Sequence, residues 1–542
     1  MENCSQIQIK SIEKASHTLK KLLAALLAFI MLFAAACKFG DIDFDVTKAP
    51  QQQTQEPTQE PAHEKTAADE AFEAVDREVF ISVVTSSGLT FHQFVKDAAS
   101  FGIAEEDIER GWGELSQEAD AADFAENAEM RKKLSEIDRS QLSYRNRIAY
   151  DNLVLNLKLS DEIHAVPDAY YYNEPLTVFN GEHTMLPLML SMYEISSAED
   201  AENYVLLLED APRYIGQIEQ FEREKAAKGL FMTENALNKV LESCTKFAET
   251  GNNCFLIGFF EDEMASAEFE ISEQQKTALL ERSRNSIINE LLPAYRSLAN
   301  TLEQLRPQCG SFAGACMRGV DAKDYYAAAI KSNAACNAEY SSMADELSES
   351  ISSVYAKLVK IILTDSNAMK DYEKNMTSGN VEKDVEYLKE LIDGIYPQIP
   401  EQSIQYVTIP DAVAEDFSPA AYMISAFDDP TRNVVLLNPT AEDDTMLFTL
   451  AHECFPGHLY QTQYFRSLDG LPLSQQLFRR MGCFFGAFYF RYQQKIRSGR
   501  LHAAGIRECA CKYSYSCICE HQGQLRRLDN GRYRRLPEVV RA

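Results

Sequence analysis

Residues 450–461 read Leu-Ala-His-Glu-Cys-Phe-Pro-Gly-His-Leu-Tyr-Gln and hold two histidines and an acid within seven positions. Neutral imidazoles bind zinc, and a neighbouring carboxylate that is not a ligand can take a proton from water held by the metal. His452 and His458 are therefore candidate metal ligands, and Glu453 is the candidate general base. The stretch predicts a hydrolytic metal site.

The spacing of the two histidines dictates the local structure. In the common zinc-peptidase signature they are four residues apart and share one helical face. Here they are six apart, which is roughly 240° around a regular helix. Pro456 and Gly457 permit a change of direction, because proline disrupts a helix and glycine accepts unusual dihedral angles. We expect a helix over 445–454, a kink, and a second helix carrying His458 and Gln461. The spacing alone fits a buried structural histidine pair equally well.

The composition restricts the class of protein. The chain has 542 residues, 45% hydrophobic and 25% charged, which is typical of a globular protein with one large domain or two ordinary ones. The formal net charge of −29 argues against a nucleic-acid partner, because the phosphates would repel it. Such acidity is common on solvated surfaces and does not identify a substrate.

The N-terminal residues have the pattern of an export signal. Lys20 and Lys21 precede a short apolar run, residues 22–33, and three alanines lead to Cys37. This order predicts a secretory signal over residues 1–36, and the run is short for a membrane span. Small residues directly before a cysteine are typical of a bacterial lipoprotein, with Cys37 as the lipidated residue. Ordinary cleavage beside an incidental cysteine is the alternative.

Residues 37–66 follow the signal and are rich in glutamine, glutamate and proline, without an apolar period. Such a segment buries too little apolar surface to fold, so we expect a disordered tether. A lipidated cysteine followed by a tether predicts an extracytoplasmic protein that is lipid-anchored to the bacterial cell membrane.

From about residue 67 apolar residues recur with a helical period, which predicts a mainly α fold. Three helical stripes are expected to pack in the core. They are Leu208, Ala211, Ile215 and Ile218; Leu280, Ile287, Leu291, Tyr295, Leu298 and Leu302; and Met343, Leu347, Ile351, Val354, Leu358 and Ile361.

A small β element is expected next to the helix that carries the histidines. Two β-branched runs, Tyr406–Ile409 and Val434–Leu437, end at Pro410 and at Asn438. The second run ends shortly before the histidine stretch. A strand beside the metal helix can pair with an extended peptide and align its scissile bond. A small structural hairpin is the alternative.

Several stretches together resemble the DUF885 family. They are Ser-Pro-Ala-Ala-Tyr at 418–422, Val-Val-Leu-Leu-Asn at 434–438, the histidine stretch itself, and, earlier in the same order, Leu-Thr-Phe-His-Gln-Phe-Val at 89–95 and Phe-Asn-Gly-Glu-His-Thr-Met-Leu-Pro at 179–187. The resemblance covers roughly residues 70 to 478. It implies a large multi-helix fold related to the gluzincin peptidases, acting on peptides or peptide-like amides.

The resemblance also implies roles for single residues. His452 and His458 would be zinc ligands and Glu453 the general base. Asn438 and Tyr422 would lie on the substrate side of the site.

One implied zinc ligand is missing from this chain. The family has the glutamate of a Glu-Gly-Trp-Ala element some twenty residues after the second histidine, where this chain reads Arg-Arg-Met-Gly-Cys at 479–483. A guanidinium cannot ligate zinc, because it is always protonated and has no lone pair to give. The zinc site is therefore expected to lack its third protein ligand.

A shift of reading frame accounts for the arginines. The five residues can be encoded by CGA AGG ATG GGC TGT, and the same string read one nucleotide later gives Glu-Gly-Trp-Ala. The same offset lets residues 527–536 encode a segment that resembles the family's C-terminus. The composition also changes here. Residues 479–542 hold 14 Lys and Arg against 4 Asp and Glu, a net of +10, whereas the preceding residues carry −39.

We therefore interpret residues 67–478 as the metallopeptidase-like domain and residues 479–542 as an out-of-frame tail. Two other interpretations of the tail are weaker. The Cys-Ala-Cys at 509–511 and Cys-Ile-Cys at 517–519 could form a second metal site, but one-residue gaps suit tetrahedral zinc poorly. The basic residues could bind an anionic partner.

The sequence as a whole predicts a membrane-tethered zinc peptidase, impaired in this copy by the loss of a ligand. The expected partners are a peptide substrate and, through the lipid anchor, the membrane. The alternative is a surface lipoprotein that binds peptides or cell-wall material without catalysis. The sequence makes no prediction of oligomeric state.

Overall fold

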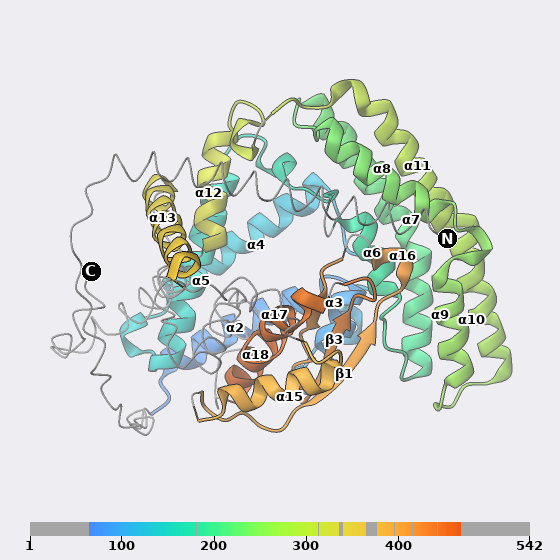
Figure 1. Cartoon of the computed structure of the whole chain (residues 1–542). Helices are drawn as coiled ribbons and strands as arrows, with labels where there is room; N and C mark the ends of the chain where they lie inside the picture. Colours follow the sequence, from blue (N-terminus) through green and yellow to red (C-terminus); the bar gives the residue numbers. More distant parts are fainter. Residues whose placement is uncertain are drawn as a thin grey trace. The chain divides into compact units, whose positions relative to one another are not determined.

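The computed structural model describes residues 64–178, 181–312, 314–334, 340–364, 377–394, 396–414, 417–441 and 443–467, and they are mainly helical (Figure 1). This confirms the predicted fold class, mainly α with a small β element. The signal segment, Cys37, nearly all of the expected tether and the tail lie outside the described residues. Within the described part of the chain, no helix is both long and apolar enough to cross a membrane.

Four helices open the described chain, and each begins after a residue with a hydroxyl group. They are α2 (Ala67–Val84), α3 (Gly88–Phe94), α4 (Gln117–Ser135) and α5 (Tyr144–His164). The side chains of Thr66, Ser87, Ser116 and Ser143 accept hydrogen bonds from backbone amides of the first turn, which have no partner inside the helix. Helices α2 and α5 share a small apolar core.

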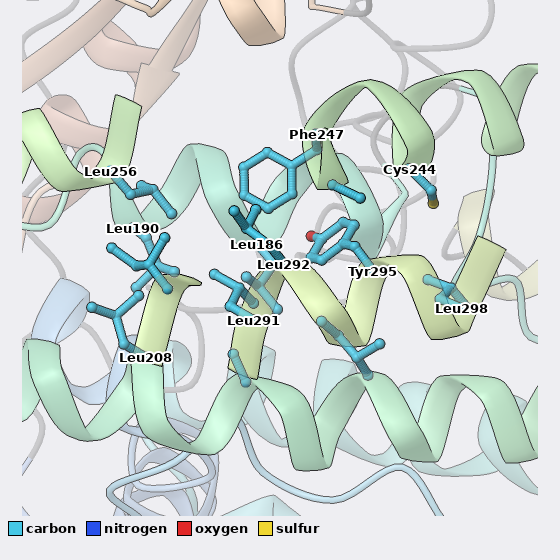
Figure 2. Packing of buried hydrophobic residues seen from close by; sticks show 14 of the residues in the cluster. Leu186, Leu190, Leu208, Cys244, Phe247, Leu256, Leu291, Leu292, Tyr295 and Leu298 are labelled. Atoms are coloured by element: carbon cyan, nitrogen blue, oxygen red, sulfur yellow. The ribbon is translucent and has the colours of Figure 1, made fainter. Parts of the chain in front are cut away.

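The largest core belongs to the helical body, which we define as α6 to α11, residues 182–305. Its helices are α6 (Glu182–Leu190), α7 (Ala198–Ala227), α8 (Glu234–Ala248), α9 (Phe255–Ser266), α10 (Glu273–Ser286) and α11 (Leu292–Leu305), with a π-helical turn, Ile287–Leu291, before α11. Figure 2 shows Leu208, Leu291 and Tyr295 in this core. Both predicted stripes in this region are buried, except that Leu280 is only partly buried.

The third stripe was predicted wrongly in part. Helices α12 (Ala322–Ala334) and α13 (Tyr340–Thr364) follow the body. The helix α13 forms as its periodicity predicts, but Leu347 is 43% exposed and Ile351 is 49% exposed. Apolar residues at a helical period indicate a helix with one apolar face, but they do not show which part of the chain packs against that face.

A three-stranded sheet follows in the order β1-β3-β2, with β1 (Ser403–Thr408), β2 (Ala420–Met423) and β3 (Arg432–Leu437). Strand β3 is central, parallel to β1 and antiparallel to β2. The two predicted strands correspond to β1 and β3, which are parallel and so do not form a hairpin. The sequence did not predict β2, which is one of the two edge strands.

Helices pack on both faces of the sheet. Val435 and Tyr422 face a core that includes Leu450 of α17 (Asp443–Glu453) and Leu388 of α15 (Val381–Ile392). On the opposite face, Leu436 packs against Leu188 of α6 and Ala414 of the short helix α16 (Asp411–Ala414). The last described helix is α18 (His458–Arg466). Short 3₁₀ turns lie at Ala98–Phe101, Glu105–Asp107, Arg139–Gln141, Ala169–Tyr172, Gly251–Asn253, Arg306–Gln308 and Ala315–Met317.

Candidate metal centre

The chain turns between the two histidines as the spacing predicts. Helix α17 ends at Glu453, and α18 begins at His458. The turn is closed by a hydrogen bond of 3.0 Å from the backbone N–H of Tyr460 to the carbonyl of Cys454. The predicted sequence of helix, kink and second helix is therefore confirmed.

Gly457 is required at this turn by close packing of the backbone. A Cβ atom at residue 457 would lie 2.6 Å from the carbonyl oxygen of Ala451 and would overlap the carbonyl of His452. Its φ is −79°, so the need for glycine comes from space and not from a left-handed conformation. Because the neighbours are backbone atoms of α17, they cannot move aside as a flexible side chain could.

The kink brings the two histidines together. Their ring centroids are 4.7 Å apart, and the ring planes meet at 87°. Ligand atoms of His452, Glu453 and His458 all lie within 4.8 Å of one another, and no other group of three such residues lies this close among the described residues. The two imidazoles therefore lie next to each other, and their role as ligands of one metal ion stays a prediction.

The protonation state of the histidines suits a metal. Burial, and then the neighbouring His452, lower the pKa of His458 to about 4. Burial also lowers the pKa of His452. Both rings are therefore neutral near pH 7 and have a lone pair to offer, which is the form that binds zinc. The donor chemistry suits zinc, which binds neutral imidazole nitrogen.

Glu453 lies beside the pair and is held by the sheet. One carboxylate oxygen, Oε2, accepts a hydrogen bond of 2.8 Å from the backbone N–H of Tyr422. The other, Oε1, is 3.7 Å from Nε2 of His452. Burial raises the pKa of Glu453 to about 7, although the bond from Tyr422 opposes the shift. A carboxylate with that pKa can accept and release a proton near neutral pH.

The edge strand β2 approaches the site through its backbone. The backbone N–H of Asn438 donates to the carbonyl of Pro419 across the sheet. Residues alternate in direction along a strand, so Ala421 and Met423 also bond toward β3, whereas Tyr422 directs its N–H and C=O to the outer edge. At this outer edge the N–H of Tyr422 is bonded to Glu453, and the carbonyl of Ala420 accepts a hydrogen bond from the hydroxyl of Ser418.

The side chains of the two predicted substrate residues are both engaged within the protein. The phenol of Tyr422 is buried and donates to Oδ1 of Asn433 at 2.8 Å. The amide of Asn438 donates to the carbonyls of Ala414 and Phe417 and accepts from the backbone N–H of Thr440. Tyr422 reaches the site by its backbone, and Asn438 fixes the loops beside the sheet.

Three polar residues near the site were not assigned a role from the sequence. Asn433 and Gln463 are buried and hydrogen-bonded to each other. Gln461, one turn after His458, is buried, and its Nε2 has no hydrogen-bond partner among the described residues. The sequence could have drawn attention only to Gln461 and Gln463, because both follow His458 closely on the same helix, α18. The expected third-ligand position, residue 479, lies outside the described residues.

Comparison with known proteins identifies the family. No curated protein matches the chain significantly. The crystal structure of "the putative lipoprotein from Colwellia psychrerythraea" is similar with a TM-score of 0.66 and 13% identity, covering 84% of this chain and 82% of that one. The structure of "a putative lipoprotein of unknown function from Shewanella oneidensis" is similar with a TM-score of 0.51 and 13% identity, covering 84% of this chain and 82% of that one. Such low identity shows likeness of fold alone. The family model DUF885, described as a bacterial protein of unknown function, matches residues 96–489, and the chain therefore belongs to this family.

Proposed function

We propose that this fold is that of a zinc-dependent peptidase which hydrolyses peptide or peptide-like amide bonds. The observation that carries the proposal is the convergence of His452, Glu453 and His458 beside the outer edge of β2. Two neutral imidazoles, a carboxylate with a pKa of about 7 and a strand edge supply metal ligands, a base and a backbone partner for the substrate.

Each group has a distinct part in hydrolysis. Zinc bound by the two imidazoles would act as a Lewis acid toward the amide carbonyl and toward water. Glu453 accepts a proton from the attacking water at Oε1, which is not used by the Tyr422 amide, and returns it to the leaving amine nitrogen. Because the N–H of Tyr422 holds Glu453, the carbonyl of Tyr422, which faces the same edge of β2, is the group that would accept a hydrogen bond from an extended peptide.

The proposal also says where the protein is located and why this copy is impaired. The pattern before Cys37 and the similarity to two lipoproteins support an extracytoplasmic protein held to the membrane by lipid. The arginines at 479 and 480 support the loss of the third zinc ligand through a frame offset. We therefore propose weak zinc binding and little turnover for the chain as encoded.

The test compares four purified proteins: the full chain as encoded and the chain with one nucleotide deleted at codon 479, each with Glu453 or with Glu453→Gln. Zinc per chain is measured by mass spectrometry, and hydrolysis is measured on a mixed peptide library. Gln keeps the size of the side chain but removes its basicity. We expect about one zinc in both frame-restored proteins and a loss of turnover of about 10²–10⁴-fold on Glu453→Gln.

Each alternative has its own outcome. If the encoded chain hydrolyses peptides at the full rate and this activity depends on Glu453, the proposed loss of the third zinc ligand is wrong. Absence of zinc from the frame-restored protein would contradict the peptidase and favour a lipoprotein that binds without catalysis. Sequencing the gene around codon 479 decides whether the offset is present in the genome.

A further inference from the structure

Asn433 lies at the centre of a buried hydrogen-bond network. It sits on the central strand β3 and is completely buried. Its Oδ1 accepts from the phenol of Tyr422 and from Nε2 of Gln463, each at 2.8 Å. Its Nδ2 donates to Oε1 of Gln402 at 2.8 Å and to the carbonyl of Thr431 at 3.0 Å. Donors and acceptor of this amide are all satisfied inside the protein.

The two donors to Oδ1 come from the two elements that carry the candidate site. Gln463 is on α18, five residues after His458. Tyr422 is on β2, and its backbone N–H holds Glu453. One oxygen atom of Asn433 is thus the common acceptor for the helix that bears a metal ligand and for the strand that holds the base.

A second connection strengthens the attachment of α18. Nε2 of Gln463 also lies 3.2 Å from Oγ of Ser425, which follows β2. Arg466, at the end of α18, donates to Oγ of Ser425 at 2.6 Å and to its carbonyl at 2.9 Å. Because α18 is only nine residues long, directional bonds at its C-terminal half fix its rotation, and hence the direction of His458 at its first position.

We propose that Asn433 is a positioning residue that holds His458 and Glu453 in register with each other, through Gln463 and Tyr422. In a core of this kind an apolar residue of equal size would pack as well but would leave the rotation of α18 undetermined. The part of the proposal that concerns zinc rests on the proposed function, whereas the part that concerns Glu453 does not require a metal.

The test uses the frame-restored full chain, which serves as the wild type here, and three variants of it that lose parts of the network: Asn433→Leu, Gln463→Leu and Tyr422→Phe. The last removes only the phenol oxygen and keeps the fold intact if the larger changes do not. The matched control is Asn146→Leu, because Asn146 is also a buried amide and bonds to Asp69 in the separate core of α2 and α5. All proteins are studied well below their unfolding temperatures.

Two readouts separate positioning from stability. Titration with Co²⁺, in competition with Zn²⁺, gives the affinity and the absorption spectrum of the metal site. Hydrogen exchange at the Tyr422 amide reports the bond to Glu453 without any metal, because this N–H faces away from β3. We expect network variants to bind metal about tenfold or more weakly with an altered Co²⁺ spectrum, and to exchange the Tyr422 amide about tenfold faster.

The outcomes are distinguishable. The control is expected to lower the unfolding temperature while affinity, spectrum and Tyr422 exchange stay as in the wild type. If the wild type binds no metal but Tyr422 exchange accelerates only in the network variants, the proposed function fails and the positioning of Glu453 stands. If exchange, affinity and spectrum in all three network variants match the wild type or the control, the role assigned to Asn433 is overturned.

Discussion

The helical body and the region around the candidate metal centre are built by different physical means. In the body, α7 and α11 bury long apolar stripes, and large side chains such as Tyr295 fill the space between helices. Around the metal centre, the decisive contacts are a backbone approach at Gly457 and buried amides such as Asn433. Apolar packing tolerates small adjustments, whereas close backbone contacts and directional bonds permit one arrangement. The body thus contributes stability, and the second region contributes geometry.

The same substitution at two glycines should have opposite effects in the two regions. Gly457→Ala forces a Cβ atom into the carbonyls of α17, and we expect a loss of about 5 kcal/mol together with the loss of metal binding. Gly216→Ala lies in α7, where a Cβ meets nothing within 4 Å. It should stabilise the protein by about 0.5–1 kcal/mol, because alanine is the better helix former. Urea unfolding measures the free energy of unfolding of each variant, and Co²⁺ titration measures its metal binding. Similar effects of Gly457→Ala and Gly216→Ala would refute the difference between the two regions.

Truncation in the body should reduce stability without disturbing the site. Leu298 is completely buried in the core of α11. Leu298→Ala removes its contacts and leaves a cavity, so we expect a loss of about 3–4 kcal/mol in the free energy of unfolding. The Co²⁺ spectrum should stay unchanged. A shifted spectrum at equal folded fraction would show that the two regions are coupled more tightly than we describe.

Some buried polar groups in the body have no hydrogen-bond partner among the described residues, as is also true of Gln461 near the site. Glu222 of α7 is completely buried, 3.9 Å from Nζ of Lys225, and neither carboxylate oxygen has a hydrogen-bond partner among the described residues. Burial raises the pKa of Glu222 to about 7, although Lys225 opposes the shift. Below pH 4.5 the carboxyl group of Glu222 is protonated in both the folded and the unfolded chain. As the pH rises toward 7, only the unfolded chain releases the proton, so the folded state loses stability.

This linkage predicts a pH-dependent effect of Glu222→Gln. The stability of the variant relative to the wild type should increase between pH 4.5 and 7, by about 2–3 kcal/mol, and stay level above that range. Unfolding in urea at several pH values gives the difference. A constant difference across the range would mean that Glu222 is solvated in the folded protein.

The smallest effect is expected on α13, where apolar residues are exposed. Leu347→Ala should change the free energy of unfolding by about 0.5 kcal/mol or less, because the side chain is 43% exposed. Comparison with Leu298→Ala, the same change at a buried site, is the control. A loss of several kcal/mol at Leu347 would show that another part of the chain covers this face.

The sequence predicted what local patterns determine and missed what tertiary contacts determine. The kink between His452 and His458 follows from Pro456 and Gly457, which have few structural options. The stripe on α11 predicted both a helix and its buried face. The edge strand β2 was not predicted, because Ala420 and Ala421 have weak β propensity and the strand depends on pairing with β3.

The role of Asn433 could not be predicted from the sequence for a related reason. Asn433 directly precedes the run Val434–Leu437, and a polar residue at this position indicates only where the apolar run of the strand begins. Its hydrogen-bond partners Gln402, Tyr422 and Gln463 are 31, 11 and 30 residues away, so only the folded chain brings them together. Its function as a common acceptor is a property of three elements and not of one.

The glycine before the second histidine has a consequence for recognising distant relatives. Because residue 457 touches the backbone of the preceding helix, the turn cannot gain or lose a residue without turning one imidazole away from the other. A search for relatives with this turn should therefore use the interval of six in place of the interval of four of the common zinc-peptidase signature. A genome search restricted to the shorter interval overlooks this chain, whereas a search for Pro-Gly directly before the second histidine retrieves it.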